Sequence, residues 1–193
     1  MYGECLWEMP RHQPKIYFTF DDGPHPSVTP FVLDQLKRFD AKATFFCIGK
    51  NVEAYPDVYR RILDEGHAVG NHSYNHLNGW KSNLEDYVGD VKKASLHIES
   101  KLFRPPYGRI TRAQLKKISE PEMNMRTVMW SVLSGDFDER QSSDQCCNNV
   151  LKFVKPGSIV VFHDSEKAWN RLSKCLPWLL EKYTSTGYFF DKI

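Results

Sequence analysis

The sequence predicts a mostly parallel α/β fold made by a single domain that spans residues 1–193. Short apolar runs alternate with segments of helical periodicity, which is typical of parallel strands joined by crossover helices. The pattern contains about seven strands, a number that suits either a barrel or an open sheet. Polar side chains follow several of these strands directly, at the edge where parallel α/β folds build their active sites.

The first expected strand covers residues 15–20, because an apolar and aromatic run stops at a turn-forming Asp-Asp-Gly-Pro sequence. Residues 29–39 place apolar side chains at helical spacing, with Thr29 as N-cap and Pro30 in the first turn. Residues 43–48 form a second apolar strand that ends at a glycine. The later elements are a short helix at 56–65, a strand at 67–69, a long helix at 84–102, an extended segment from Phe103, a helix at 113–118, strands at 126–132 and 158–162, helical segments around Val150 and at 172–183, and a last strand at 188–190.

The composition is that of an ordinary globular protein, with 41% hydrophobic residues, 26% charged residues and a formal net charge of +2. No run of lysine or arginine occurs, so no nucleic-acid partner is expected. No stretch is apolar enough to span a bilayer. No feature of the sequence predicts an oligomeric state.

Two observations favour a cytoplasmic location. Residues 1–10 carry two glutamates and no apolar core, so they are not expected to act as a signal peptide. The five cysteines include no C-x-x-C pair, and an odd count favours reduced thiols over a set of disulfides. A leader removed from the chain is the alternative.

Several residues that could bind a metal or transfer a proton lie directly after the expected strands. They are Asp21 and Asp22, His72, Arg104, Asp136, and the His163-Asp164 pair. Because the carboxyl ends of parallel strands meet at one edge of the sheet, we expect these side chains to converge.

A divalent-metal site is predicted within this group. His72 and His76 are four residues apart, so both imidazoles can project from one face of a helical turn toward one ion. Asp22 can supply a carboxylate, which gives two nitrogens and one oxygen and leaves positions for water and substrate. Two adjacent carboxylates also favour a nearby cation. One of them would bind the metal, and the other would act as general base.

Several motifs, taken in order, resemble the polysaccharide deacetylases with a NodB-homology domain, carbohydrate esterase family 4. They are T-F-D-D-G at 19–23, H-S-x-x-H at 72–76, R-P-P-Y at 104–107, and the apolar strand leading to His163. The resemblance covers the chain from Lys15 to its C-terminus. It implies the fold of that family, a distorted (β/α) barrel of about seven strands, where the pattern alone leaves barrel and open sheet undecided.

The resemblance also implies roles for individual residues. Asp21 corresponds to the general base, and Arg104 to the residue that fixes its position and charge. Asp22, His72 and His76 correspond to the metal ligands. The metal in this family is usually zinc, and cobalt or nickel are the alternatives.

The remaining implied roles concern the oxyanion and the leaving group. The backbone N–H of Tyr107 would help to stabilise the oxyanion, His163 would protonate the departing amine, and Asp136 would hold His163 protonated. The sequence departs from the family pattern at Leu133, where an aspartate is usual, and at Phe137, where a tryptophan is usual. Neither change removes a group with an implied catalytic role, although substrate preference can shift.

The predicted function is therefore metal-dependent hydrolysis of acetyl groups from N-acetylglucosamine units of a polysaccharide or oligosaccharide. An O-acetyl esterase acting on xylan-like glycans is a second hypothesis, because the same groups cleave esters. A catalytically inactive sugar-binding domain is a third, and the intact set of acids and histidines argues against it.

Overall fold

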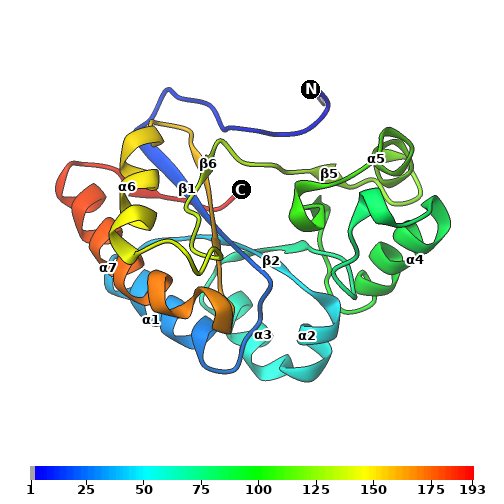
Figure 1. The fold of residues 1–193 in the computed structure, drawn as a ribbon, viewed down its shortest axis with the longest axis horizontal. Coiled ribbons are helices and arrows are strands. Elements are labelled where there is room, and N and C mark those ends of the chain that lie inside the picture. Colours follow the sequence, from blue (N-terminus) through cyan, green and yellow to red (C-terminus); the bar gives the residue numbers. More distant parts are fainter. Residues whose placement is uncertain (1–2) are drawn as a thin grey trace.

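A curled sheet of parallel strands organises the computed structural model, which describes residues 3–193 (Figure 1). Seven strands pair in the order β5-β4-β3-β2-β1-β7-β6, and β8 adds to one end of β1. The strands are β1 (Lys15–Asp21), β2 (Thr44–Cys47), β3 (Ala68–Asn71), β4 (Leu102–Phe103), β5 (Arg126–Thr127), β6 (Val132–Leu133), β7 (Ile159–His163) and β8 (Phe189–Phe190). The first two residues of the predicted domain lie outside the described residues.

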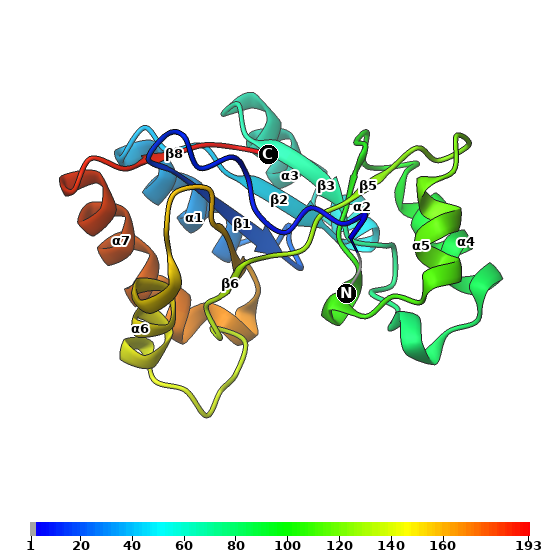
Figure 2. The same cartoon turned by 90° about the horizontal axis from the view of Figure 1, so that it is seen from above.

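Helices follow most strands and cover the outside of the sheet. In Figures 1 and 2, α1, α6 and α7 lie at one end of the molecule, and α4 and α5 lie at the other. The helices are α1 (Val28–Arg38), α2 (Gly49–Ala54), α3 (Pro56–Asp64), α4 (Leu84–Ala94), α5 (Arg112–Ser119), α6 (Ser143–Phe153) and α7 (Trp169–Ser185), with short 3₁₀ turns η1 (Gly79–Lys81), η2 (Pro106–Gly108) and η3 (Glu166–Ala168). None of the helices in the described part of the chain is long and apolar enough to cross a membrane.

The prediction of a distorted barrel is confirmed, and the prediction of one strand over 126–132 is wrong. Its two ends belong to opposite edges of the curled sheet, β5 and β6. The backbone between them changes partner along its length, since the N–H of Val128 donates to the carbonyl of Phe103 and that of Ser131 to the carbonyl of Ile159. An apolar run therefore bridges the open side of the barrel instead of forming one continuous strand.

The core is built on the two faces of β1. Phe18 and Phe20 point toward the helical layer, where they join the apolar side chains of α1 and α7. Tyr17 points to the opposite face and packs with Phe46 and other residues inside the sheet's curl. Because successive side chains of a strand alternate, Asp21 shares the face of Tyr17, and it sits at the carboxyl end of β1. Burial of each core phenylalanine contributes on the order of 1.5–3 kcal/mol.

Two helix predictions differ from the structure. The long helix expected at 84–102 ends at Ala94, and the residues that follow turn back toward the sheet. The longer helix was predicted because apolar residues continue past Ala94. One of them, Leu96, is 81% exposed, so it does not extend the buried face of the helix. Helix α2 was not predicted, because its six residues contain a single buried apolar side chain, Val52.

Candidate active site

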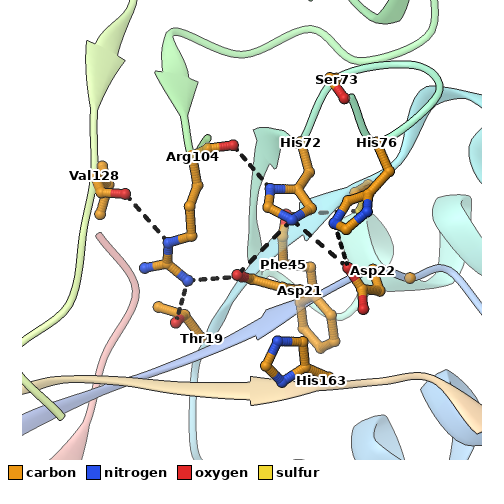
Figure 3. A network of polar contacts seen from close by, with 12 residues as sticks. Thr19, Asp21, Asp22, Phe45, His72, Ser73, His76, Arg104, Val128 and His163 are labelled. Atoms are coloured by element: carbon orange, nitrogen blue, oxygen red, sulfur yellow. Dashed lines mark hydrogen bonds and ion pairs between the residues drawn. The ribbon is translucent and has the colours of Figure 1, made fainter. Parts of the chain in front are cut away.

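The three predicted metal ligands meet at the carboxyl end of the sheet (Figure 3). The Oδ1 atom of Asp22 lies 3.2 Å from Nε2 of His76 and 3.6 Å from Nε2 of His72. One ligand atom from each residue falls within 4.8 Å of the others, and the structure brings no other such group of three together in its described residues. Two nitrogens and one carboxylate oxygen facing a common point suit a divalent ion with open positions.

The loop that carries the two histidines is not a helical turn, so that part of the prediction is wrong. Ser73 and His76 both have left-handed backbone conformations, with φ of 61° and 59°. The buried carboxylate of Asp90 holds this loop by accepting the backbone N–H groups of Tyr74 and Asn75, both at 2.9 Å. The histidines meet because α4 anchors their loop through Asp90.

The ring of His72 is set up to offer a lone pair. Its Nδ1 lies 2.8 Å from the carbonyl oxygen of Arg104, which can only accept a hydrogen bond, so Nδ1 carries the proton and Nε2 faces Asp22. Burial lowers the pKa of His72 to about 4, which keeps the imidazole neutral. Burial alone would raise the pKa of Asp22, but the hydrogen bond from His76 and the neighbouring histidines lower it well below its ordinary value. A neutral imidazole and an ionised carboxylate are the forms that bind a metal, so these residues fit the predicted ion.

Asp21, on the same turn as Asp22, pairs with a buried arginine. Its Oδ1 accepts a hydrogen bond of 2.7 Å from Nη1 of Arg104, and its other oxygen lies 4.0 Å from His72. Arg104 is fully buried, and its remaining donors go to the hydroxyl of Thr19 and to the carbonyls of Val128 and Met129. The guanidinium therefore fixes the orientation of Asp21 and supplies its counter-charge.

His163 forms an ion pair with Asp136 on the other side of the turn. Its Nδ1 lies 2.8 Å from Oδ1 of Asp136, and its backbone N–H donates to the second oxygen at 2.7 Å. Ser134 also donates to this carboxylate, and Nε of Arg171 donates to the backbone carbonyl of Asp136 at 2.6 Å. Burial would lower the pKa of His163, but the charge and hydrogen bond of Asp136, together with the charges of Asp22 and Asp21, outweigh burial and raise the pKa to about 9. His163 is thus protonated at neutral pH.

A cavity of about 1080 Å³ opens over these groups. Tyr107 is 61% exposed, and its ring centroid lies 4.5 Å from that of His76. On the opposite side, the ring of Phe137 lies 5.2 Å from His163. The predicted residues Asp21, Asp22, His72, His76, Tyr107 and His163 all line this cavity, whereas Arg104 and Asp136 support it from behind.

Comparison with known proteins gives the family. Residues 8–125 match the family model described as polysaccharide deacetylase. The chain belongs to the polysaccharide deacetylase family. A peptidoglycan-N-acetylglucosamine deacetylase of Bacillus cereus is 38% identical over 90% of the chain, which spans 66% of that protein. A chitooligosaccharide deacetylase of Azorhizobium caulinodans is 36% identical over 80% of the chain, which spans 75% of it. The crystal structure of the Bc1960 peptidoglycan N-acetylglucosamine deacetylase superposes with a TM-score of 0.90 at 34% identity, covering 98% of this chain and 91% of that one.

Two carboxylates support this polysaccharide deacetylase site in ways that the sequence did not predict: Asp90 was missed, and Asp164 was expected at the site without a role. Asp90 holds the histidine loop, and Asp164 holds the turn that carries Asp21 and Asp22 by accepting hydrogen bonds from the N–H of Gly23 at 3.0 Å and from the hydroxyl of Thr29. Its position directly after His163 placed Asp164 among the residues expected to converge, but no local pattern predicted which groups its carboxylate would bind. Asp90 lies within a helix and gave no signal, because helical aspartates are usually solvated.

The two departures from the family pattern lie on the cavity wall. Phe137 and Leu133 both line the cavity and are partly exposed. Phe137 supplies an apolar ring beside His163, and Leu133 adds an aliphatic side chain where a carboxylate is usual. This side of the polysaccharide deacetylase site is therefore more apolar than the family pattern predicts.

Proposed function

We propose that this chain hydrolyses the acetamido group of N-acetylglucosamine units in a glycan and releases acetate. The observation that carries the proposal is the placement of three systems around one cavity: a carboxylate fixed by a buried arginine, a ligand set for a divalent ion, and a protonated histidine. The similarity to deacetylases of N-acetylglucosamine-containing glycans supports the same reaction.

The base and the acid have different environments, as amide hydrolysis requires. We assign Asp21 as the general base, since Arg104 orients it and supplies its counter-charge through one carboxylate oxygen, Oδ1, and leaves the other free of that contact. We assign His163 as the general acid, since Asp136 keeps it protonated near neutral pH. An amine is a poor leaving group, so its protonation is needed for the C–N bond to break. Each proton transfer by a positioned group contributes on the order of 10²–10⁴-fold.

Asp22, His72 and His76 would hold the divalent ion, and we propose zinc as its identity, with cobalt or nickel as alternatives. When bound, the ion polarises the acetyl carbonyl and lowers the pKa of water. The backbone N–H of Tyr107 would donate to the oxyanion from the rim of the cavity. Loss of one such donor typically costs roughly 10²–10³-fold in rate. The apolar ring of Phe137 and the buried side chain of Val161 line the wall beside His163 and would contact the acetyl methyl.

The test is acetate release by protein of measured metal content. We expect acetate from N-acetylated chito-oligosaccharides and little from acetylated xylan. Asp21→Asn should remove turnover while the bound metal is retained, whereas Asp22→Asn should reduce the metal content. Metal binding without acetate from any amide or ester would contradict the proposal and favour a sugar-binding domain. Faster release from xylan would favour the O-acetyl esterase.

A further inference from the structure

A second buried arginine lies beside the active site, and the proposed reaction does not yet use it. Arg171 occupies the first turn of α7 and is only 6% exposed. Burial removes water from its guanidinium, which is costly for a charged group. A cation in the first turn of a helix also meets the positive end of the helix dipole. Neither burial nor the helix favours an arginine at this position, so the reason for it lies in the contacts of the guanidinium.

The guanidinium of Arg171 joins two segments that flank His163. Its Nε donates to the carbonyl of Asp136 at 2.6 Å, and its Nη2 donates to the carbonyl of Lys167. Asp136 lies in the loop between β6 and α6, whereas Lys167 lies in η3, shortly after the strand that ends at His163. A planar guanidinium presents several donors in a fixed fork, so one side chain can satisfy both carbonyls.

These two segments form the wall of the cavity around His163. Phe137 follows Asp136 directly, lines the cavity, and places its ring 5.2 Å from that of His163. Ser165 and Lys167 line the cavity from the other segment. Arg171 lies behind this wall, because it is buried and is not one of the residues that line the cavity. It therefore acts on the site through the residues that it binds.

Arg171 contacts Asp136 without competing with His163. One carboxylate oxygen of Asp136 lies 2.8 Å from Nδ1 of His163 and also accepts the hydroxyl of Ser134 at 3.0 Å. The other oxygen accepts the backbone N–H of His163 at 2.7 Å. The guanidinium binds the backbone carbonyl of Asp136 instead. The carboxylate thus remains with the histidine while the arginine holds the peptide that carries it.

A second helix holds the other end of the same loop. Asn149 of α6 donates to the carbonyl of Ser134 at 3.0 Å and to the side-chain oxygen of Gln141 at 2.9 Å. Gly135 lies between the two held positions with φ of 79°, and a β-carbon there would lie 2.8 Å from Gln141. The conformation of the loop that carries Asp136 therefore depends on contacts from both α6 and α7.

We propose that Arg171 is a positioning residue for the general acid, because it holds the Asp136 carboxylate against Nδ1 of His163. The other ring nitrogen, Nε2, then gives its proton to the amine nitrogen as that nitrogen takes the electron pair of the breaking C–N bond. His163 is left neutral and regains a proton from water. A displacement of about 1 Å in such a group can cost on the order of 10²-fold in rate. This inference rests on the proposed deacetylase activity and adds a residue that serves it through Asp136.

The first test is a double-mutant cycle on the whole chain loaded with zinc, with N-acetylated chito-oligosaccharides as substrate. We expect Arg171→Met to lower kcat by roughly 10- to 10²-fold and to change KM by less than about twofold, because the loss falls on proton transfer. Arg171→Lys retains a donor and should recover part of kcat. In an Asp136→Asn background, Arg171→Met should have little further effect, since residues that act as a unit are not additive.

The second test changes the leaving group. The phenolate of para-nitrophenyl acetate departs without a proton, whereas the amine of a sugar needs one. Arg171→Met should therefore slow acetate release from the sugar amide and change cleavage of the aryl ester by less than about twofold. Asp21→Asn should slow both reactions, because both need an activated water. A role of Arg171 in general stability of the site would slow the two substrates alike.

Two further variants separate positioning from stability. Arg61→Met is the matched control, since Arg61 also lies on a helix and binds two acceptors, but on α3 and outside the cavity. It should change the free energy of unfolding and leave kcat unchanged. Asn149→Ala removes the α6 contact with the loop of Asp136 and should lower kcat on a smaller scale, again without effect in the Asp136→Asn background. This variant decides the question if Arg171→Met does not fold.

The possible failures are distinguishable. Wild-type kcat in Arg171→Met, full additivity with Asp136→Asn, or an equal loss on the sugar amide and the aryl ester would each overturn the positioning role and leave the deacetylase proposal standing. A change in KM alone would also overturn it, because the loss would then lie in substrate binding. Absence of acetate from chito-oligosaccharides with the wild-type protein would overturn the deacetylase proposal itself.

Discussion

Arg104 reaches Asp21 from inside the barrel, and it does so with a fully buried side chain. Its Nη1 donates to Oδ1 of Asp21 at 2.7 Å, while Nε and Nη2 donate to the carbonyls of Val128 and Met129. Those two carbonyls lie in the segment that bridges the open side of the barrel. The guanidinium of Arg104 therefore connects the candidate base, Asp21, to the segment that joins the two edges of the curled sheet.

Arg104→Lys is expected to impair activity more than stability. A lysine keeps the charge beside Asp21, but its compact ammonium cannot reproduce the fixed fork that also satisfies Val128 and Met129. We expect kcat to fall on the order of 10²-fold, with the loss confined to the chemical step. Acetate release and urea unfolding measured on the same preparations would check this.

Arg104→Met provides the contrast to the lysine variant. It leaves the buried carboxylate of Asp21 without its partner, and breaking a buried pair in this way typically costs about 3–5 kcal/mol. An Arg104→Met variant as stable as the wild type would show that Asp21 does not depend on this ion pair.

Much of the candidate site could be predicted because it follows from strand geometry. Parallel strands end at one edge, so Asp21, His72, Arg104 and His163 had to converge once their strands were identified. The alternation along β1 then places Asp21 on the inner face, opposite its phenylalanine neighbours. These inferences need only the period of a strand and the direction of the chain.

The parts that could not be predicted depend on contacts between distant segments. The left-handed conformation of His76 follows from a loop that Asp90 holds across fifteen residues or more, and no local pattern encodes it. Residues 126–132 are a plausible strand by composition, but their N–H groups find partners on two different strands. In both segments, hydrogen bonds to distant parts of the chain determine the backbone conformation, and the local sequence pattern does not.

Asp136→Asn is expected to shift the pH dependence of turnover. The pKa of His163 is raised to about 9, and the largest favourable cause is the charge of Asp136. A general acid works while protonated, so wild-type activity should fall as the pH rises through about 9. The asparagine retains the hydrogen bond to the backbone of His163 but removes the charge, so the decline should move toward the ordinary histidine pKa of about 6.5. A profile of kcat against pH that keeps its alkaline limb in the variant would contradict the assignment.

Metal removal is expected to abolish turnover and to lower the stability of the fold. A ligand present at 100 times its Kd stabilises the folded state by about 2.7 kcal/mol. Chelation should therefore lower the melting temperature, and added zinc should restore both activity and stability. His72→Ala and His76→Ala should lose this response. His12→Ala, which changes an exposed histidine outside the site, should keep it. Equal responses in all three variants would place the ion elsewhere.

Asp164→Ala is expected to destabilise the turn that carries Asp21 and Asp22. The substitution leaves the N–H of Gly23 and the hydroxyl of Thr29 without their acceptor in a fully buried position. Each unsatisfied group costs about 1–3 kcal/mol. Asp164→Asn retains an acceptor for Gly23 and should lose less stability. Denaturant unfolding that gives equal free energies for the two variants would show that these hydrogen bonds do not hold the turn.

The same residue predicts a pH dependence of folding in metal-free protein. Burial raises the pKa of Asp164 to about 8, whereas the unfolded chain titrates near the ordinary aspartate value of about 4. Between these values the folded state binds the proton and the unfolded state does not. The contribution of Asp164 is therefore complete below about pH 4 and is lost as the pH rises toward 8. Asp164→Asn cannot titrate, so its free energy of unfolding should improve relative to the wild type between pH 5 and pH 8. Parallel unfolding free energies for the two proteins across that range would mean that Asp164 is already ionised in the folded state.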